Sequence, residues 1–338
     1  MENNSFTFNF KKLPWAAITV LCVALLFEIF NRVFDDRMYP FPYDGLRMKI
    51  KNQISQTRDT GYDVLIMGDC FNLHGINPLI IEKETGLKVF NYATHSDYTI
   101  LTSYILLKNH LEHNRKKPSI IVINFIPELT VYGYNAFNKR SLPFLFDIKE
   151  GNFFTLMKEI GFQKAVQLQF YSLKNSPFFS EYKFVSGLAD AKEINDFKKS
   201  VWEEKGYYRR YGEGVYTDYY APRPFRYQYR PSPFFEKYLR KILDLARENH
   251  IFVFFPMITA PEDVYENLYR PSYMIELYFS FLANLKKEYP NLFFWGWQSE
   301  FSNCKLYRDT VHLNHKGCAL FSQKIAQMIF TAQQKMQK

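Results

Sequence analysis

A cysteine near the start of the chain and an Asp/His pair near its end have the residue types of a nucleophilic catalyst. Cys70 follows Gly68-Asp69, and Asp309 precedes His312 by three residues. That spacing lets the carboxylate reach one imidazole nitrogen while the other nitrogen faces a nucleophile, which fixes the tautomer and stabilises the imidazolium. A thiol beside such an imidazole is activated more readily than a hydroxyl, because the thiolate is accessible near neutral pH. We therefore predict a triad with Cys70 as nucleophile, His312 as base and Asp309 as its orienter.

The residues just before Cys70 are typical of a buried strand in a parallel sheet. Val64–Met67 is a short apolar run rich in branched side chains, and Gly68-Asp69 is a turn signal. Open α/β sheets place their chemistry at the carboxyl ends of their strands. We expect Cys70 in the turn at that edge of the sheet, with Asp69 capping the turn.

Strand and helix patterns alternate through the first and last thirds of the chain, which predicts a doubly wound parallel sheet. The pattern lapses between about residues 132 and 230 and then resumes, and no internal repeat is visible. This favours one α/β domain over residues 61–338 with a large insertion at about 132–230. Further strands are expected at 88–92, 119–125, 251–256 and 292–295, and helices at 78–86, 98–114, 233–249, 273–289 and from 316 to the end.

An apolar run near the amino terminus predicts a membrane anchor. Residues 13–30 are almost wholly apolar and just long enough to span a bilayer. Lys11-Lys12 before the run favours a cytoplasmic tail over residues 1–12 and an extracytoplasmic location for everything after the anchor. A polar connector with a helical tendency, residues 31–60, would join the anchor to the α/β domain. The alternatives are a cleaved signal peptide, for which no A-x-A-like site follows, and a core helix.

The end of the insertion is rich in tyrosine and arginine. Aromatic rings suit the faces of sugars, and arginine suits phosphate or carboxylate groups. The alternatives are an irregular insertion packed on the core and a surface that contacts anionic lipid headgroups. The candidate substrate-binding residues are Tyr207, Tyr208, Arg209, Arg210, Arg226 and Tyr227.

The net charge of +9 permits acidic partners but comes without any recognisable nucleic-acid-binding module. Four scattered cysteines exclude a disulfide framework, although Cys304 and Cys318 would either pair in an extracytoplasmic domain or stay as two isolated thiols. His312 and His315 have the spacing of some zinc ligands, but a third ligand is not evident, so we predict no metal site. His74 and His95 are interpreted as loop histidines.

Together, these motifs resemble the SGNH/GDSL hydrolase superfamily. Gly68-Asp69-Cys70, Asn91 after the second strand and Asp309-x-x-His312 before the last helix match the order of its first, second and fifth blocks. The resemblance covers most of residues 62–130 and 250–330. It implies a three-layer, flavodoxin-like fold and a triad in which Cys70 replaces the family's serine. An anchor before such a core is similar to the membrane-bound branch that acylates envelope polymers, including teichoic-acid D-alanyl transfer and alginate O-acetylation proteins.

The resemblance also indicates an oxyanion hole, with departures. Its backbone donors would be the N–H groups of Cys70 and Ser96, the latter standing where the family has glycine. The family's Gly-x-Asn-Asp block is absent after the third strand, and Asn124 is the candidate for the missing side-chain donor. Losing such a donor costs about 2.7–4 kcal/mol of transition-state stabilisation in other acyl-transfer enzymes.

These features favour a membrane-anchored, extracytoplasmic acyltransferase or esterase acting on O-acyl groups of an envelope polysaccharide or glycolipid. A thioester on Cys70 would carry the acyl group, and no diffusible cofactor is required. By resemblance, a multi-pass O-acyltransferase of the membrane would be a partner. The alternative is a non-catalytic scaffold or carbohydrate-binding component of an envelope-modification complex.

Overall fold

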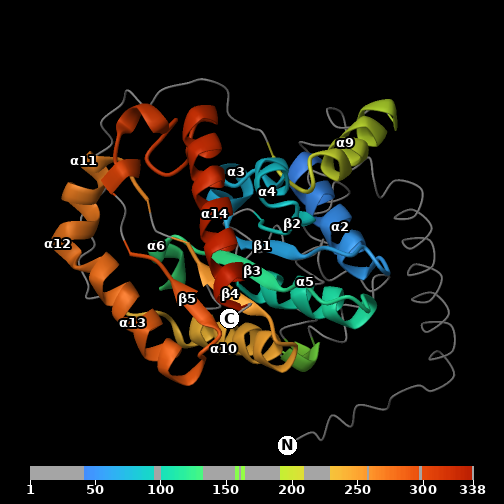
Figure 1. The fold of residues 1–338 in the computed structure, drawn as a ribbon, viewed down its shortest axis with the longest axis horizontal. Coiled ribbons are helices and arrows are strands. Elements are labelled where there is room, and N and C mark those ends of the chain that lie inside the picture. The colour runs from blue at the N-terminus through green and yellow to red at the C-terminus, as the bar shows by residue number, and fades with distance from the viewer. Residues whose placement is uncertain are drawn as a thin grey trace, which may run out of the picture.

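Five parallel strands in the order β2-β1-β3-β4-β5 form the centre of the fold (Figure 1). The computed structural model describes residues 42–94, 100–131, 157–159, 161–163, 191–208, 229–256, 259–296 and 299–336. The order is that of flavodoxin-like sheets, so the predicted α/β class with a parallel sheet is confirmed. The strands are β1 (Val64–Gly68), β2 (Val89–Asn91), β3 (Ile120–Asn124), β4 (Phe252–Phe255) and β5 (Leu292–Phe294).

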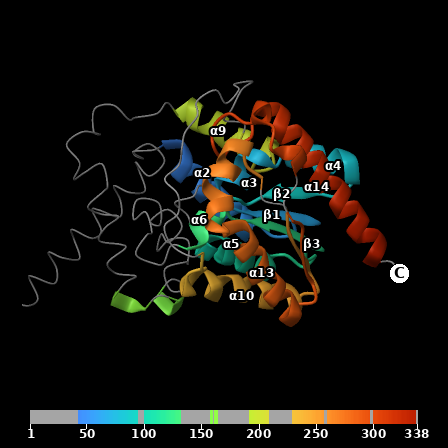
Figure 2. The same cartoon turned by 90° about the vertical axis from the view of Figure 1, so that its left-hand side faces the viewer.

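Helices lie on both faces of the sheet, as Figure 2 shows with α10 below the strands and α14 above them. Each helix predicted in the first and last thirds of the chain is present within a residue or two of the expected ends. The longer helices of the described part are α2 (Pro42–Gln56), α4 (Pro78–Thr85), α5 (Ile100–His113), α9 (Ala191–Glu203), α10 (Pro233–Glu248), α13 (Met274–Glu288) and α14 (His315–Met336). The shorter ones are α3 (Cys70–Gly75), α6 (Pro127–Thr130), α11 (Glu262–Val264), α12 (Arg270–Ser272), the π-helix η5 (Tyr265–Tyr269), and the 3₁₀ turns η6 (Ser299–Phe301) and η7 (Cys304–Leu306).

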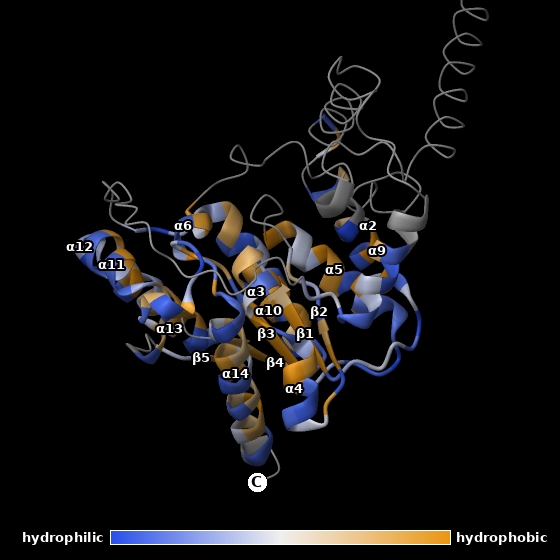
Figure 3. Ribbon diagram, turned by 90° about the horizontal axis from the view of Figure 1, so that it is seen from above, coloured by the Kyte–Doolittle hydropathy of each residue, from blue (hydrophilic) through white to orange (hydrophobic). Residues whose placement is uncertain are grey.

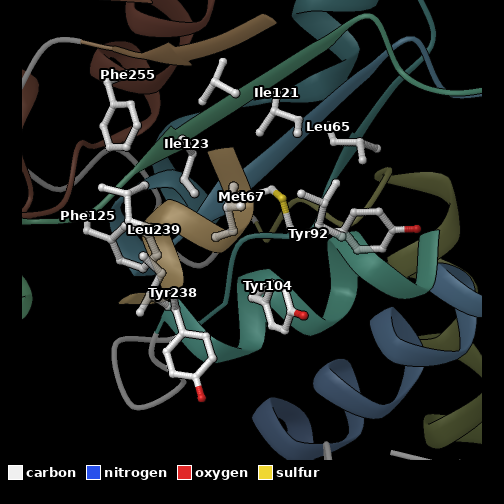
Figure 4. Close-up of a cluster of buried hydrophobic side chains, with 14 of the residues drawn as sticks. Leu65, Met67, Tyr92, Tyr104, Ile121, Ile123, Phe125, Tyr238, Leu239 and Phe255 are labelled. Carbon is white, nitrogen blue, oxygen red and sulfur yellow. The ribbon is translucent and has the colours of Figure 1, made fainter. Parts of the chain in front are cut away.

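Alternate residues of β1 face two separate cores, because successive side chains of a strand point to opposite faces. Leu65 and Met67 pack with α2, α5, α10 and α13, and this core is drawn in Figure 4. Val64 and Ile66 pack with α3, α4 and α14. Figure 3 shows the central strands as hydrophobic, whereas α14 carries both hydrophobic and hydrophilic residues. The domain therefore has three layers, and α3 and α14 lie on the same side of the sheet.

The helical tendency expected in the connector takes the form of α2, which packs against α5. The side chains that α2 buries include Met48, Ile54 and the polar residues Lys51 and Asn52. Helix α2 thus contributes to the core that lies under β1. The predicted tail and anchor fall outside the described residues, as does most of the predicted insertion. Among the helices that the structure does describe, none is both long and apolar enough to cross a bilayer.

The carboxyl end of β1 approaches the neighbouring strand β3 too closely for any side chain. Gly68 pairs with Asn124, and a Cβ added to Gly68 would lie 1.9 Å from the Asn124 carbonyl oxygen. Gly68 also has φ of +121°, a conformation that L side chains rarely adopt. Because position 68 is glycine, β1 and β3 can lie this close, and the residues that follow each strand therefore meet at one place.

We predict that Gly68→Ala lowers the free energy of unfolding by on the order of 3 kcal/mol or more, since it adds a backbone clash to an unfavourable φ. Gly86→Ala is the matched control, because Gly86 has φ of +71° with nothing within 4 Å of the added Cβ. The control should lose only about 1–2 kcal/mol. Denaturant unfolding of the full chain measures both, and equal losses would contradict the steric account.

Candidate active site

Cys70 is the first residue of helix α3, whereas we expected it to lie in the turn after β1. The turn consists of Gly68-Asp69 alone, and Asp69 is the N-cap of α3, with Oδ1 accepting the Phe71 N–H at 2.9 Å. The predicted capping role of Asp69 is thereby confirmed. Its other oxygen, Oδ2, accepts the N–H of Ile126 in the segment after β3 at 2.6 Å. One carboxylate therefore fixes both the start of the helix that carries Cys70 and the exit of the neighbouring strand.

Two asparagines hold the short helix α3 against the sheet. Asn72 Nδ2 donates to the Met67 carbonyl at 2.6 Å, and Asn91 Nδ2 donates to the carbonyls of Asn72 and Ile76 at 2.9 and 3.1 Å. A helix of six residues is too short to be stable alone, so these side-chain bonds account for its position. Asn91, which the sequence analysis assigned to the second block of the family pattern, thus holds α3 in place through these two hydrogen bonds.

Asp309 and His312 lie in a tight loop that leads into α14. Asp309 Oδ1 accepts the N–H groups of Val311 and His312 at 2.9 and 2.7 Å, and Arg308 N–H donates to the His312 carbonyl. The His312 Nδ1 atom lies 2.9 Å from Asp309 Oδ2 and 3.1 Å from Oδ1. A carboxylate only accepts at neutral pH, so Nδ1 carries the proton and Nε2 is the basic nitrogen.

The Asp309 carboxylate stays ionised in this setting. Burial acts to raise the pKa of its carboxyl, but the hydrogen bonds and charge of His312 and the two backbone N–H groups outweigh burial and lower the pKa to about 2. The pair is thus a carboxylate and an oriented imidazole, as a nucleophilic triad requires.

The structure brings this loop onto the helix that carries Cys70. The His312 ring contacts the His74 ring with centroids 5.5 Å apart, and His74 lies one turn after Cys70 on the same face of α3. The charge of His312 also acts on Asp69, the residue before Cys70. Leu313 is buried and lies against the carboxyl end of α3 near Gly75. The first strand and the last loop therefore meet, although about 240 residues of sequence separate them.

Of the three candidate oxyanion partners, the structure describes Cys70 and Asn124 but not Ser96. Asn124 lies at the end of β3 beside Gly68, is 2% exposed, and its Oδ1 has no hydrogen-bond partner among the described residues. Cys70, in the first turn of α3, has a backbone N–H of the kind that helices leave unused internally. Ser96 and His95 lie outside the described residues. The segment leading to Ser96 is tied to the site, because Thr94 N–H donates to the Gly68 carbonyl at 3.0 Å.

The tyrosines at the end of the insertion have different surroundings. Tyr207 is 6% exposed, and its hydroxyl lies 3.1 Å from Cys318 Sγ, so its ring is part of the core and not of an exposed sugar-binding surface. Tyr208 places its ring 5.2 Å from the His74 ring, and the Arg47 guanidinium lies 3.6 Å above the Tyr208 centroid. Arg209, Arg210, Arg226 and Tyr227, the other candidates in this tract, lie outside the described residues.

The structure also describes several cysteines and histidines outside the predicted triad. Cys304 and Cys318 are separate thiols, which decides between the two alternatives for them. His315 is exposed at the first position of α14, and no three His, Cys, Asp or Glu side chains gather as metal ligands within the described ranges. His74 is not a loop histidine, because it lies in α3 and is 3% exposed.

Glu128 is a half-buried acid near the site that the sequence analysis did not single out, and its Oε2 atom is inaccessible to solvent. It lies in α6 directly after β3, and the negative charge of Asp69 acts on it. Burial raises the pKa of Glu128 to about 7, against hydrogen bonds from its own N–H and from Tyr269, and burial likewise raises the pKa of Asp69 to about 6. A π-helical segment, η5, places Tyr269 beside this acid. The acid adjoining β3 is therefore partly neutral at pH 7.

The raised pKa of Glu128 gives a stability prediction. A carboxyl whose pKa is raised from 4.5 to about 7 on folding stabilises the protein below pH 4.5 and loses that contribution as the pH rises through 7. Glu128→Gln, which is neutral throughout, should match the parent below about pH 4 and exceed its unfolding free energy by on the order of 2 kcal/mol near pH 8. Unfolding at a series of pH values measures the difference. Glu84→Gln on the exposed face of α4 is the control, and a Glu128→Gln difference that does not change with pH contradicts the prediction.

Comparison with known proteins adds no further constraint. The sequence matches no protein-family model and no curated protein sequence.

Proposed function

We propose that this chain is a membrane-anchored, extracytoplasmic acyltransferase or esterase that acts on O-acyl groups of a cell-envelope polysaccharide or glycolipid. The observation that carries the proposal is the contact between the His312 ring and the Cys70-bearing face of α3, with Asp309 bonded to the far nitrogen of His312. Support also comes from the parallel sheet, because Cys70 follows the carboxyl end of β1, which lies between β2 and β3.

The proposed reaction has two steps, acylation of Cys70 and transfer of the acyl group to an acceptor. His312 Nε2 takes the thiol proton, and the Cys70 thiolate attacks the acyl carbonyl carbon. The carbon–oxygen bond of the donor breaks, and the imidazolium returns its proton to the leaving oxygen. In the second step an acceptor hydroxyl or water attacks the thioester, His312 takes its proton, and the carbon–sulfur bond breaks to release the thiolate. Asp309 stabilises the imidazolium in both steps.

The membrane setting belongs to the same proposal. Residues 13–30 would be the anchor and residues 1–12 the cytoplasmic tail, so that the α/β domain faces the envelope. A multi-pass O-acyltransferase would supply the acyl group across the membrane, and the tyrosine- and arginine-rich tract would contact the polymer. The reaction needs no diffusible cofactor, because the acyl group is carried on sulfur.

A non-catalytic scaffold or carbohydrate-binding component of the same machinery is the rival function. The observation that favours it is the segment after β3, which reads Phe125-Ile126-Pro127-Glu128 and lacks the Gly-x-Asn-Asp block that carries a side-chain donor in the family. The two functions differ in what happens when the thiol is removed.

We predict that Cys70→Ala abolishes acylation of the envelope polymer in cells, whereas Cys70→Ser keeps a reduced activity because a hydroxyl is a weaker nucleophile. Intact-mass analysis after incubation with p-nitrophenyl acetate should give one acetyl adduct that maps to Cys70. Cys304→Ala, which removes a partly exposed thiol outside the proposed triad, should keep the adduct. If Cys70→Ala modifies the polymer as the parent does, the scaffold function is correct.

Asp309→Asn should slow acylation of Cys70 by roughly 10²–10⁴-fold, because the amide cannot hold the reactive tautomer of His312 or stabilise its charge. The burst of p-nitrophenol release measures this rate. Asp59→Asn is the matched control, since Asp59 is exposed and precedes the opposite, amino-terminal end of β1. Equal burst rates for the parent and Asp309→Asn would remove Asp309 from the mechanism.

A further inference from the structure

Helix α2 carries a lysine that lies entirely inside the protein. Lys51 is 0% exposed, and its Nζ atom donates to the carbonyl oxygen of Ala93 at 2.5 Å. Burial, and after it the neighbouring charge of Arg47, lowers the pKa of the Lys51 ammonium well below its usual range. An apolar side chain would fill the same space without the cost of removing an amine from water. The position of Lys51 is therefore better explained by its hydrogen bond than by core packing.

The carbonyl that Lys51 binds belongs to a peptide group next to the candidate nucleophile. The Ala93 carbonyl and the Thr94 N–H lie in one peptide plane, because the bond between them is rigid. The Thr94 N–H donates to the carbonyl of Gly68 at 3.0 Å, two residues before Cys70. One side of this peptide is thus held by Lys51, and the other side is held by the turn that leads to the thiol.

The strand before this peptide is held without Lys51. Tyr92 N–H donates to the Ile66 carbonyl at 2.7 Å, as neighbouring parallel strands do. Ala93 N–H donates to Asn91 Oδ1 at 2.8 Å. What Lys51 adds is therefore the orientation of the peptide that follows Ala93. Without the amine, the buried carbonyl loses this donor, and the peptide gains a reason to rotate toward another one.

We propose that Lys51 is a positioning residue for the oxyanion hole. It holds the Ala93–Thr94 peptide, and with it the chain that leads two positions further to Ser96, the predicted second backbone donor. When the Cys70 thiolate adds to the acyl carbonyl, the electron pair of the C=O bond moves onto oxygen, where the backbone donors stabilise it. The pair returns as the leaving oxygen departs with the proton from His312. Lys51 acts through the peptide and does not touch the acyl group.

This inference rests on the proposed acylation of Cys70, and two reactions of the same thiol test it. Acylation by p-nitrophenyl acetate passes through an oxyanion. Alkylation by iodoacetamide displaces iodide from a saturated carbon and forms no oxyanion. We expect Lys51→Met in the full chain to slow the p-nitrophenol burst by roughly ten- to a hundredfold, since removing an oxyanion donor outright costs about 10²–10³-fold. The rate of alkylation of Cys70, followed by intact mass, should stay within about threefold of the parent.

The comparison of the two rates separates positioning from a merely structural role. If both rates equal those of the parent, or if both fall by the same factor, the proposal is overturned. Lys51→Leu, which also removes the donor, gives the same test if Lys51→Met does not fold. If the parent itself gives no burst, the proposed function fails and this inference fails with it, which is a different result from a burst that Lys51→Met leaves unchanged.

A matched control removes another buried polar side chain away from the site. Asn114 is 2% exposed and bonds the Thr60 N–H and the Thr57 carbonyl, in the segment before the amino end of β1. Asn114→Ala should lower the free energy of unfolding while the ratio of the burst rate to the alkylation rate stays that of the parent. A ratio that falls in Asn114→Ala as far as in Lys51→Met would overturn the assignment to Lys51.

Discussion

The geometry of the site depends on one buried carboxylate. Asp69 accepts one hydrogen bond from the start of α3 and another from the segment after β3. It can do so only because Gly68 lets β1 and β3 approach within a distance that excludes any side chain. Desolvation of that carboxylate raises its pKa to about 6, so its charge is held in place at a cost. A positive charge on His312 acts in the opposite direction and lowers the pKa of Asp69, so the protonated form of His312 favours the ionised carboxylate.

The backbone of the fold was largely predictable, whereas the contacts within the site were not. Branched apolar runs and glycine or proline boundaries identify β1, β3 and α4, because local patterning decides those elements. The start of α3 at Cys70 was missed because six residues show no periodicity, and the helix depends on the side chain of Asn91 from another strand. The pairing of Asp309 with His312 followed from spacing alone and agrees with the observed bond.

The surroundings of His74 and Glu128 could not be predicted from the local sequence. Nothing near His74 in the sequence indicates that Tyr208 would hold its ring, since that bond joins residues 134 positions apart. Glu128 has no local mark of burial either, and its raised pKa arises from desolvation together with the charge of Asp69 on a different element. A histidine one turn after the candidate nucleophile was nevertheless a usable signal, because the i, i+4 spacing already placed both on one face of any helix there.

The distance in sequence between α3 and its partners has a consequence for how the protein is made. Cys70 follows β1, and a ribosome synthesises His312 about 240 residues later. Until the loop that carries His312 folds onto α3, the nascent chain carries Cys70 without the proposed base. Under the proposed function, activation of the thiol therefore requires this long-range contact to form first.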